Sequence, residues 1–212
     1  MSRGSNGHRL LQQPHRWLGW LLLALIWVGL ACQSGNPDAA LQEKLDAILA
    51  ASWQFYKSHF IQADGRVVRP DNQNDTVSEG QAYALLRAVW SNDQATFDRV
   101  YGWTEANLSQ QQTKGRHLLA WHFGQAEDGQ WQVLDGNSAT DADLDYALAL
   151  LLAHQRWGQP TGSLPSYHEK AQLVLKDILT YSTAEDAAGR LWLTPGDWAP
   201  THRRPAASSA VL

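Results

Sequence analysis

The sequence has a single cysteine, Cys32, among its 212 residues. One thiol excludes an intramolecular disulfide and any zinc site built from several cysteines. The eight histidines are scattered, with no His-x-x-x-His pair, so we expect no structural metal and no cofactor. Strand and helix patterns do not alternate along the chain, which excludes a doubly wound parallel sheet.

Acidic residues are missing from the first part of the chain, where Arg3, Arg9 and Arg16 all precede Cys32. The formal net charge of the whole sequence is −4, and removal of these three positive charges leaves −7. Such an acidic remainder argues against nucleic acid or an anionic membrane surface as the partner.

Residues 1–31 have the pattern of a targeting segment: a basic start, then an apolar run over residues 17–31 that is too short for a comfortable membrane span. We therefore expect export to the periplasm, the outer envelope or the medium, and a division into a signal, residues 1–32, and a folded part, residues 33–212. Cys32 closes the run V-G-L-A-C, which is close to a bacterial lipobox although Gly29 stands where that motif prefers Leu. Cys32 is thus a candidate for lipidation and membrane anchoring.

Helical periodicity dominates the folded part. It predicts five helices, over about residues 37–61, 76–90, 93–110, 138–158 and 165–182. Loops or short strands are expected near residues 67–68 and 118–133, and no ordered pattern follows Trp192. Helices joined by loops of uneven length predict an all-α domain.

The helix predicted over residues 138–158 carries three acids, Asp141, Asp143 and Asp145, in its first turns. Ser138 or Thr140 is its candidate N-cap, and carboxylates near a helix N-terminus are stabilised by the free N–H groups there. Capping accounts for one or two acids and not for three. Apolar residues at helical spacing predict the buried face of this helix: Leu144, Ala147, Leu148, Leu151 and Leu152.

A second acid, Glu79, stands in T-V-S-E-G-Q at another predicted helix start, where Thr76 fits a capping box. Two carboxyl groups on either side of a bond are what glycoside hydrolysis requires. The folded part also holds eight of the 11 tryptophans. We expect half of them in the core, and the others on a surface where their rings would stack on sugars.

Four segments in order resemble glycoside hydrolase family 8, the bacterial endoglucanases. They are T-V-S-E-G-Q-A-Y-A-L-L-R-A-V, F-D-R-V-Y-G-W-T-E-A-N-L, L-L-A-W-H-F and N-S-A-T-D-A-D-L-D-Y-A-L-A-L-L-L-A-H-Q-R-W-G. The resemblance covers about residues 39–198. It implies an (α/α)6 barrel of paired helices, a monomer that cuts internal β-1,4-glucosidic bonds with inversion, and a β-glucan polysaccharide as partner.

By this resemblance Glu79 is the proton donor and Asp141 is the signature aspartate. An inverting reaction forms no covalent intermediate, so positioning or distorting the central sugar suits Asp141 better than nucleophilic attack. The resemblance further implies four substrate-binding residues: Tyr83, Trp121, Asn137 and Asp143. Tyr146 departs from the family signature, which prefers Ile or Met, and we expect this change to affect packing and not chemistry.

In this family the aspartate taken as general base lies well downstream of the A-T-D-A-D helix. Asp197 is the last acid in the sequence, but its position matches a loop before that base. We therefore expect only the N-terminal part of the barrel, a poor or inactive hydrolase, and unpaired apolar stripes on the helices over residues 41–60 and 167–179. Three alternatives remain open: the same fold acting on chitosan, xylan or mixed-linkage glucan, a non-catalytic glucan-binding remnant, and a helical envelope scaffold without a ligand.

Overall fold

The computed structural model describes residues 37–199. The chain divides into two units, Met1–Ile48 and Leu49–Leu212. The predicted targeting segment and Cys32 lie outside the described residues, so export and lipidation stay predictions. None of the helices among residues 37–199 combines the length and the apolar character that crossing a membrane requires.

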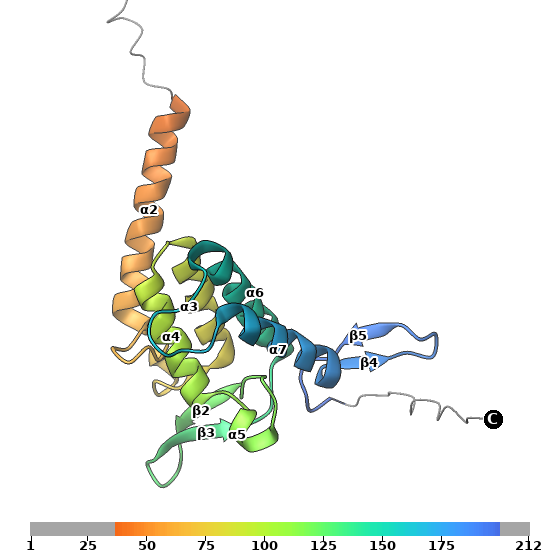
Figure 1. The fold of residues 1–212 in the computed structure, drawn as a ribbon. Helices are drawn as coiled ribbons and strands as arrows, with labels where there is room; N and C mark the ends of the chain where they lie inside the picture. Colours follow the sequence, from red (N-terminus) through yellow and green to blue (C-terminus); the bar gives the residue numbers. More distant parts are fainter. Residues whose placement is uncertain (1–36, 200–212) are drawn as a thin grey trace, which may run out of the picture. The chain divides into compact units, whose positions relative to one another are not determined.

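Helices make up most of the described chain (Figure 1). In order the elements are α2 (Pro37–Phe60), the 3₁₀ turn η1 (Pro70–Asn72), β1 (Thr76–Val77), α3 (Ser78–Trp90), α4 (Gln94–Asn107), α5 (Gln111–Lys114), β2 (His122–Gln125), β3 (Trp131–Asp135), α6 (Thr140–Trp157), α7 (Tyr167–Tyr181), β4 (Thr183–Glu185) and β5 (Leu191–Leu193). The five predicted helices are confirmed as α2, α3, α4, α6 and α7. The short strands expected within residues 118–133 are confirmed as β2 and the start of β3.

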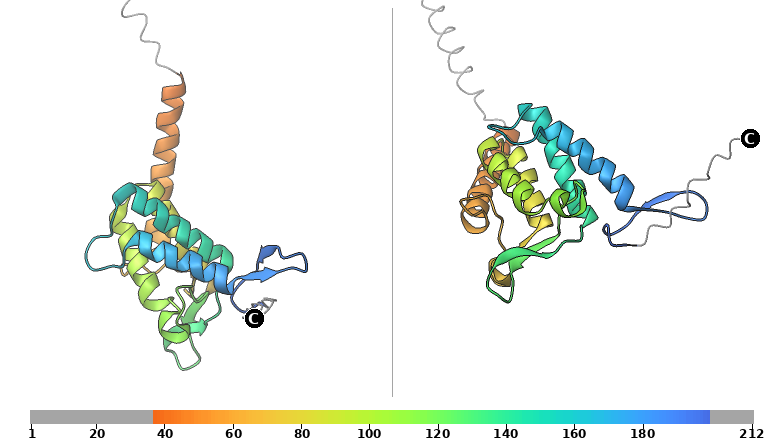
Figure 2. Two further views of the ribbon diagram at one scale, coloured as in Figure 1. Left: turned by 45° about the vertical axis from the view of Figure 1, so that its right-hand side comes forward. Right: turned by 60° about the horizontal axis from the view of Figure 1, so that its bottom comes forward.

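The core lies where α3 packs against both α4 and α6, and α7 packs on the other side of α6 (Figures 1 and 2). Each helix contributes side chains that are almost fully buried: Leu85 and Val89 from α3, Phe97 and Tyr101 from α4, Tyr146 and Leu150 from α6, and Tyr167 and Val174 from α7. Of the eight tryptophans in the described chain, only Trp53 of α2 and Trp103 of α4 are buried. The expectation that half of them are core residues is therefore wrong.

A polar network is buried among three of these helices. Glu105 of α4 accepts a hydrogen bond from the Tyr146 hydroxyl of α6 and pairs with the ammonium group of Lys170 of α7. Lys170 is 3% exposed, so this pair is held in a dry environment where removing one partner is costly. Tyr146 therefore contributes a specific hydrogen bond as well as packing.

The buried face of α6 differs from the predicted one. Tyr146, Ala149, Leu150 and Ala153 are fully buried, whereas Leu148 is 44% and Leu151 is 36% exposed. Of the predicted stripe, Ala147 is buried and Leu144 and Leu152 pack half-buried against the core, so the prediction is confirmed for these three and wrong for Leu148 and Leu151. The apolar face toward the neighbours is built largely from alanine and tyrosine, which a leucine-based pattern underweights.

The two outer stripes behave differently from one another. In the first unit, Leu41, Leu45 and Ile48 of α2 are all exposed, as expected. In the second unit, Trp53 of the same helix is buried and Tyr56 and Phe60 pack against the core, so the expectation is wrong for this part of the stripe. In the second unit, the α7 stripe is covered because Tyr167, Val174 and Ile178 pack on α6, so the expectation of an unpaired stripe there is wrong. Only Leu179 at the end of that stripe remains 60% exposed.

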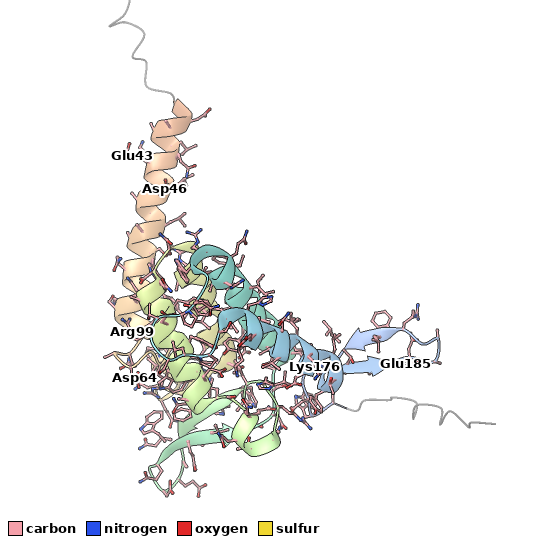
Figure 3. The ribbon with its side chains drawn as sticks, viewed as in Figure 1. Glu43, Asp46, Asp64, Arg99, Lys176 and Glu185 are labelled. Atoms are coloured by element: carbon pink, nitrogen blue, oxygen red, sulfur yellow. The ribbon has the colours of Figure 1, made fainter. Side chains whose placement is uncertain are left out.

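Two small antiparallel sheets complete the second unit. β2 pairs with β1 on one side and β3 on the other, with Thr76 opposite Phe123 and Val77 opposite His122. β4 and β5 form a hairpin directly after α7, and Figure 3 labels Lys176 near the end of that helix and Glu185 on β4. This hairpin was not predicted.

The loop after α2 lies close against α4. Gly65 has φ +101°, and a Cβ there would lie 2.2 Å from the carbonyl oxygen of Arg99, so only glycine fits. Asp64 and Arg99, labelled in Figure 3, mark the two sides of this approach. The loop that runs on from this contact supplies one wall of the candidate site.

Candidate active site

The start of α3 is fixed by a strand and not by a side-chain cap. Its N-cap residue, Val77, is extended and makes no side-chain hydrogen bond, while the N–H of Ser78 donates to the carbonyl oxygen of Trp121 at 3.0 Å. Thr76, the predicted cap, turns away and donates its hydroxyl to the carbonyl oxygen of Val67 at 2.8 Å. The capping-box interpretation of Glu79 is therefore wrong.

Glu79 is half-buried in the first turn of α3. Its Oε2 atom is buried and has no hydrogen-bond partner. A carboxyl oxygen that is removed from water and left unpaired costs free energy, so such a group needs an explanation. One explanation is a ligand that exchanges a proton or a hydrogen bond with this oxygen.

Glu79 lines a cleft of about 540 Å³. Three aromatic rings share its walls, those of Tyr56, Phe60 and Tyr83. Tyr83 is 53% exposed although it is a large ring on a core helix. Aromatic faces beside a carboxyl group suit a sugar, because its C–H faces are apolar while its hydroxyls need polar partners.

Tyr83 links the acids of α3 and α6. Burial raises the pKa of its hydroxyl, and the charges of Asp145, Asp141 and Glu79 raise it further. Asp145 also lines a cavity of about 550 Å³ that shares Tyr83 with the first cleft. The charges of both predicted acid clusters therefore act on Tyr83, which borders the cleft of Glu79 and the cavity of Asp145.

A buried carboxylate organises the other wall of the cleft. Asp75 accepts hydrogen bonds from Arg69 Nε at 2.7 Å and from His122 Nε2 at 2.9 Å, and also from Asn72. Burial raises the pKa of Asp75, but these hydrogen bonds outweigh burial and hold it below its usual range. Arg69 is thereby kept beside the cleft, where it senses the charge of Glu79.

The start of α6 also lacks a side-chain cap. The N-cap residue is Ala139, so the predicted caps Ser138 and Thr140 are wrong by one position. The N–H of Thr140 donates instead to the carbonyl oxygen of Pro195 at 3.0 Å. The segment after β5 thus holds the N-terminal end of α6. The prediction of a patternless end after Trp192 is therefore wrong for residues 193–199. Residues 200–212 lie outside the described chain.

The three aspartates of α6 have different surroundings. Asp141 is exposed, Asp145 is half-buried and Asp143 is completely buried. Burial raises the pKa of Asp145, with a further contribution from the charge of Asp141. Asp143 cannot touch a substrate from this position, so the predicted substrate contact is corrected to a structural one.

Asp197 is held by ion pairs beneath the same helix start. Its carboxylate lies 2.9 Å from Lys114 Nζ and 2.7 Å from Arg116 Nη1, and it accepts from the N–H of Ser138 at 2.8 Å. The Asp197 side chain is 1% exposed. Burial raises its pKa, but the Ser138 N–H and the two cations outweigh burial and hold it below its usual range.

Trp121 and Asn137 line a separate cavity of about 390 Å³ together with Trp198. The N–H of Trp121 donates to the carbonyl oxygen of Asn137 at 2.8 Å, which holds the two predicted substrate contacts together. The Trp121 side chain also hydrogen-bonds Asp135 and lowers the pKa of that carboxyl group. Of the predicted site residues, only Asp143 is therefore out of reach of a ligand.

Sequence reasoning missed the residues that support the site. Arg69 and Asp75 stand in none of the quoted motifs. His122 stands in L-L-A-W-H-F, but its contact with Asp75, 47 residues earlier, is not visible in the sequence. Gln81 stands inside the quoted E-G-Q motif, where its side chain accepts from the N–H of Val67 at 2.6 Å and so holds the cleft wall to α3. Trp198 could have been proposed as a site residue because its aromatic ring directly follows Asp197, although no helical period surrounds it.

Within residues 37–199 no group of three or more His, Cys, Asp or Glu side chains could hold a metal ion. The cleft combines the half-buried carboxyl group of Glu79, the exposed carboxylate of Asp71 and aromatic walls on a scaffold of paired helices. This combination is typical of sites that bind carbohydrate in proteins built from paired helices.

The comparison with known families agrees. Residues 15–203 match the sequence model of the family described as "Glycosyl hydrolases family 8". The chain belongs to glycoside hydrolase family 8, and its paired helices correspond to part of the (α/α)6 barrel of that family.

Three similar proteins illustrate the match. The chain is 42% identical over 127 residues to an endoglucanase of Pseudomonas fluorescens (strain SBW25), and 43% identical over 107 residues to one of Escherichia coli (strain K12). These alignments cover 59% and 50% of this chain but only 30% and 29% of the relatives. The crystal structure of an endo-1,4-D-glucanase from Vibrio fischeri ES114 has 36% identity and a TM-score of 0.61 over 70% of this chain and 41% of that one. The chain thus spans about a third of the length of the curated relatives that it matches.

Proposed function

We propose that this chain is part of an enzyme that hydrolyses internal β-1,4-glucosidic bonds with inversion of configuration. The observation that carries the proposal is the unpaired, buried Oε2 of Glu79 at the wall of a cleft with three aromatic rings. A general acid must present its carboxyl group at a point that a bound sugar can reach, and Glu79 at the cleft wall does so. The endoglucanase names of the relatives support the same substrate class.

In the proposed reaction Glu79 gives its proton to the bridging oxygen as the bond to the anomeric carbon breaks. A water molecule attacks that carbon from the opposite face and loses its proton to a second carboxylate. Asp141 is exposed, and its charge acts on Tyr83 of the cleft wall; in the proposed reaction it accepts hydrogen bonds from the central sugar and holds it in position. Asp143 and Asp197 are excluded as the base, because one is fully buried and the other is bound to two cations.

The stereochemistry of the first product tests this proposal. The complete enzyme, mixed with a soluble β-1,4-gluco-oligosaccharide, should release α-anomers first, as followed by ¹H NMR before mutarotation. Retention of the β-configuration would contradict inversion, and no release of reducing ends from carboxymethylcellulose would contradict glucan hydrolysis. Glu79→Gln should lose nearly all hydrolysis. Glu127→Gln, the same change of glutamate to glutamine in an exposed turn outside the cavities lined by Glu79 and Trp121, is the matched control and should hydrolyse at the normal rate.

Chitosan, xylan and mixed-linkage glucan are the alternative substrates, since they share backbone geometry with cellulose and differ in ring substituents or linkage. A panel of the four polysaccharides at equal mass, assayed for reducing ends, separates them. Cellulose or carboxymethylcellulose should give the highest rate, and a tenfold preference for another member would move the assignment.

A second candidate function is glucan binding without hydrolysis. The observation in its favour is that Asp143 and Asp197, two of the acids near the start of α6, are both committed to structural contacts. A binding remnant would be retarded in native gels containing β-glucan while releasing no reducing ends. An active hydrolase would release them.

We further propose export, lipidation at Cys32 and a monomeric state, all supported by the sequence alone. Mass spectrometry of the protein from its natural host should find a mature N-terminus at or near Cys32, carrying acyl chains. An intact Met1 in a cytosolic fraction would contradict export, and an unmodified Cys32 would contradict lipidation. Size-exclusion chromatography with light scattering tests the monomer.

A further inference from the structure

Asp143 is the buried acid that the proposed reaction does not use. It lies in the first turn of α6, two residues after Asp141, with its side chain fully buried. Its Oδ1 accepts a hydrogen bond from the N–H of Leu119 at 2.9 Å, and the Ser138 side chain also hydrogen-bonds it. Its Oδ2 is buried and has no partner in the described chain.

The surroundings of Asp143 are acidic. Asp197, from the segment after β5, and Asp141, from α6 itself, both act on its carboxyl group, and the neutral phenol of Tyr146 lies on the same helix. Lys114 and Arg116 are engaged by Asp197 and not by Asp143. Burial, together with these two negative charges, raises the pKa of Asp143 to about 7, whereas that of Asp197 is lowered. Ser138 therefore contacts one acid whose pKa is raised and one whose pKa is lowered.

Two parts of the candidate site meet at this carboxyl group. Leu119, whose N–H donates to Asp143, precedes Trp121 by two residues. Asp141 precedes Asp143 by two residues on α6. We propose that Asp143 is a positioning residue that, in its neutral form, fastens the loop carrying Trp121 to the helix start carrying Asp141. Its ionised form places a third negative charge beside Asp141 and Asp197 in a dry pocket, and so loosens this junction.

Amide hydrogen exchange at Leu119 tests the junction directly and needs no substrate. Asp143→Asn keeps the shape and an accepting oxygen but cannot ionise, so Leu119 should stay protected at pH 6 and at pH 8. Asp143→Ala removes the acceptor, so protection should fall at least tenfold at both. In the wild-type chain protection, corrected for the intrinsic rate, should be lower at pH 8 than at pH 6.

Asp177→Ala is the matched control for Asp143→Ala, because Asp177 accepts the N–H of His117 at 2.6 Å in the same loop. It should lower protection at His117 and leave Leu119 protected. If Asp143→Asn loses protection as fully as Asp143→Ala, the neutral-acid proposal is overturned. The same follows if wild-type protection is equal at the two pH values.

Stability against pH gives a second readout. A raised pKa means that the folded chain binds the proton more tightly than the unfolded chain does between about pH 4 and pH 7. The wild-type chain therefore loses stability from this group as the pH rises through that window, and Asp143→Asn does not. The melting temperature of Asp143→Asn minus that of the wild type should grow from pH 4 to pH 7 and then level off. A constant difference would overturn the proposal.

Hydrolysis gives the last readout, and this arm alone rests on the proposed function. Asp143→Asn in the complete enzyme should keep kcat at pH 6 and extend the alkaline limb of the pH profile. A loss of kcat at every pH, with Leu119 still protected, would mean that Asp143 acts as a charged catalytic group and not as a positioning one. Absence of hydrolysis in the wild type would count against the proposed function and leave the exchange and stability tests standing.

Discussion

The starts of α3 and α6 both carry acids in the first helical turn and both lack a side-chain cap, yet they treat those acids differently. At α3 a two-residue strand holds the backbone, and Glu79 is left with an unpaired oxygen at the wall of a cleft. At α6 the N–H of Thr140 donates to the carbonyl oxygen of Pro195, and the N–H of Ser138 donates to Asp197, which two cations hold in place. An acid at a helix start thus says little by itself. Its partners decide whether it reacts, supports or only caps.

The comparison explains why helix-cap rules misjudged both places. Carboxylates are favoured at helix N-termini for electrostatic reasons, whether or not they bond a specific N–H. At α3 and α6 other segments of the chain supply the capping contacts, which frees Glu79 and Asp141 to face solvent or ligand. A third helix start, that of α4, shows the ordinary case, because Asp93 there accepts the N–H of Thr96 at 3.1 Å.

Replacing Glu79 with glutamine should have the largest effect. The amide keeps the shape and loses the proton, so hydrolysis of carboxymethylcellulose by the complete enzyme should fall by about 10²–10⁴-fold. Because Glu79 makes no capping bond, the free energy of unfolding should change by less than about 1 kcal/mol. Rates and melting curves for the wild type, Glu79→Gln and Glu127→Gln measure both quantities. A lower melting temperature of Glu79→Gln together with an unchanged rate of hydrolysis would indicate that Glu79 acts as a helix cap and not as the general acid.

Asp197→Asn should have the next largest effect, and on stability. The change leaves Lys114 and Arg116 without a carboxylate in a place where the aspartate side chain is 1% exposed. Loss of a buried charge-assisted hydrogen bond costs about 1–3 kcal/mol, read from urea unfolding. Asp128→Asn, which alters an exposed acid that accepts the N–H of Gln130, should cost far less. Equal costs would mean that the brace beneath α6 is dispensable.

Gly196→Ala tests the same brace through its backbone. A Cβ there would lie 2.2 Å from the carbonyl oxygen of Ser138, so the segment must move away from α6. Overpacking of this kind costs about 1–3 kcal/mol. Gly136→Ala is the control in the neighbouring loop, because the nearest atom to its Cβ would be 4.0 Å away. Thermal unfolding that ranks the two variants in the opposite order would contradict the described contact.

Asp93→Asn should have the smallest effect and supplies the reference for a capping acid. Burial raises the pKa of Asp93, but hydrogen bonds from Lys57, Thr96 and Trp53 outweigh it and lower the pKa to about 2. A lowered pKa stabilises the folded chain above about pH 4, and this contribution is lost as the pH falls toward 2. The variant should be about 1 kcal/mol less stable at pH 6 and should lose less stability than the wild type between pH 4 and pH 2. Urea unfolding across that range measures both.

Helix positions followed from the sequence, and helix faces did so only in part. The five long helices were found because apolar residues at helical spacing mark them regardless of their partners. For α6 the pattern held leucines on two sides, and the side that is buried depends on where α3 and α7 pack. The choice between Tyr146 and Leu148 is therefore a tertiary property and cannot be made from a single helix.

The site divides in the same way. Glu79, Tyr83, Asp141, Trp121 and Asn137 could be predicted as site residues because they stand in motifs that resemble a known family. The structural roles of Asp75 and Asp197 could not be predicted, because their partners His122, Lys114 and Arg116 are distant in sequence. Asp143 was found as a site residue and given the wrong role, because sequence does not reveal that its side chain is fully buried.

The two-residue strand β1 also sets the order in which the cleft can form during folding. Glu79 lies two residues after Val77, whose partner in the sheet, His122, comes much later in the chain. The N–H of Ser78, between them, can donate its hydrogen bond only once the carbonyl oxygen of Trp121 is present. Contacts between distant segments are slow to form, because a long loop must close before they yield any stabilisation. On a growing chain α3 can therefore coil early, while its first turn gains its shape only after residues 121–135 have emerged and paired.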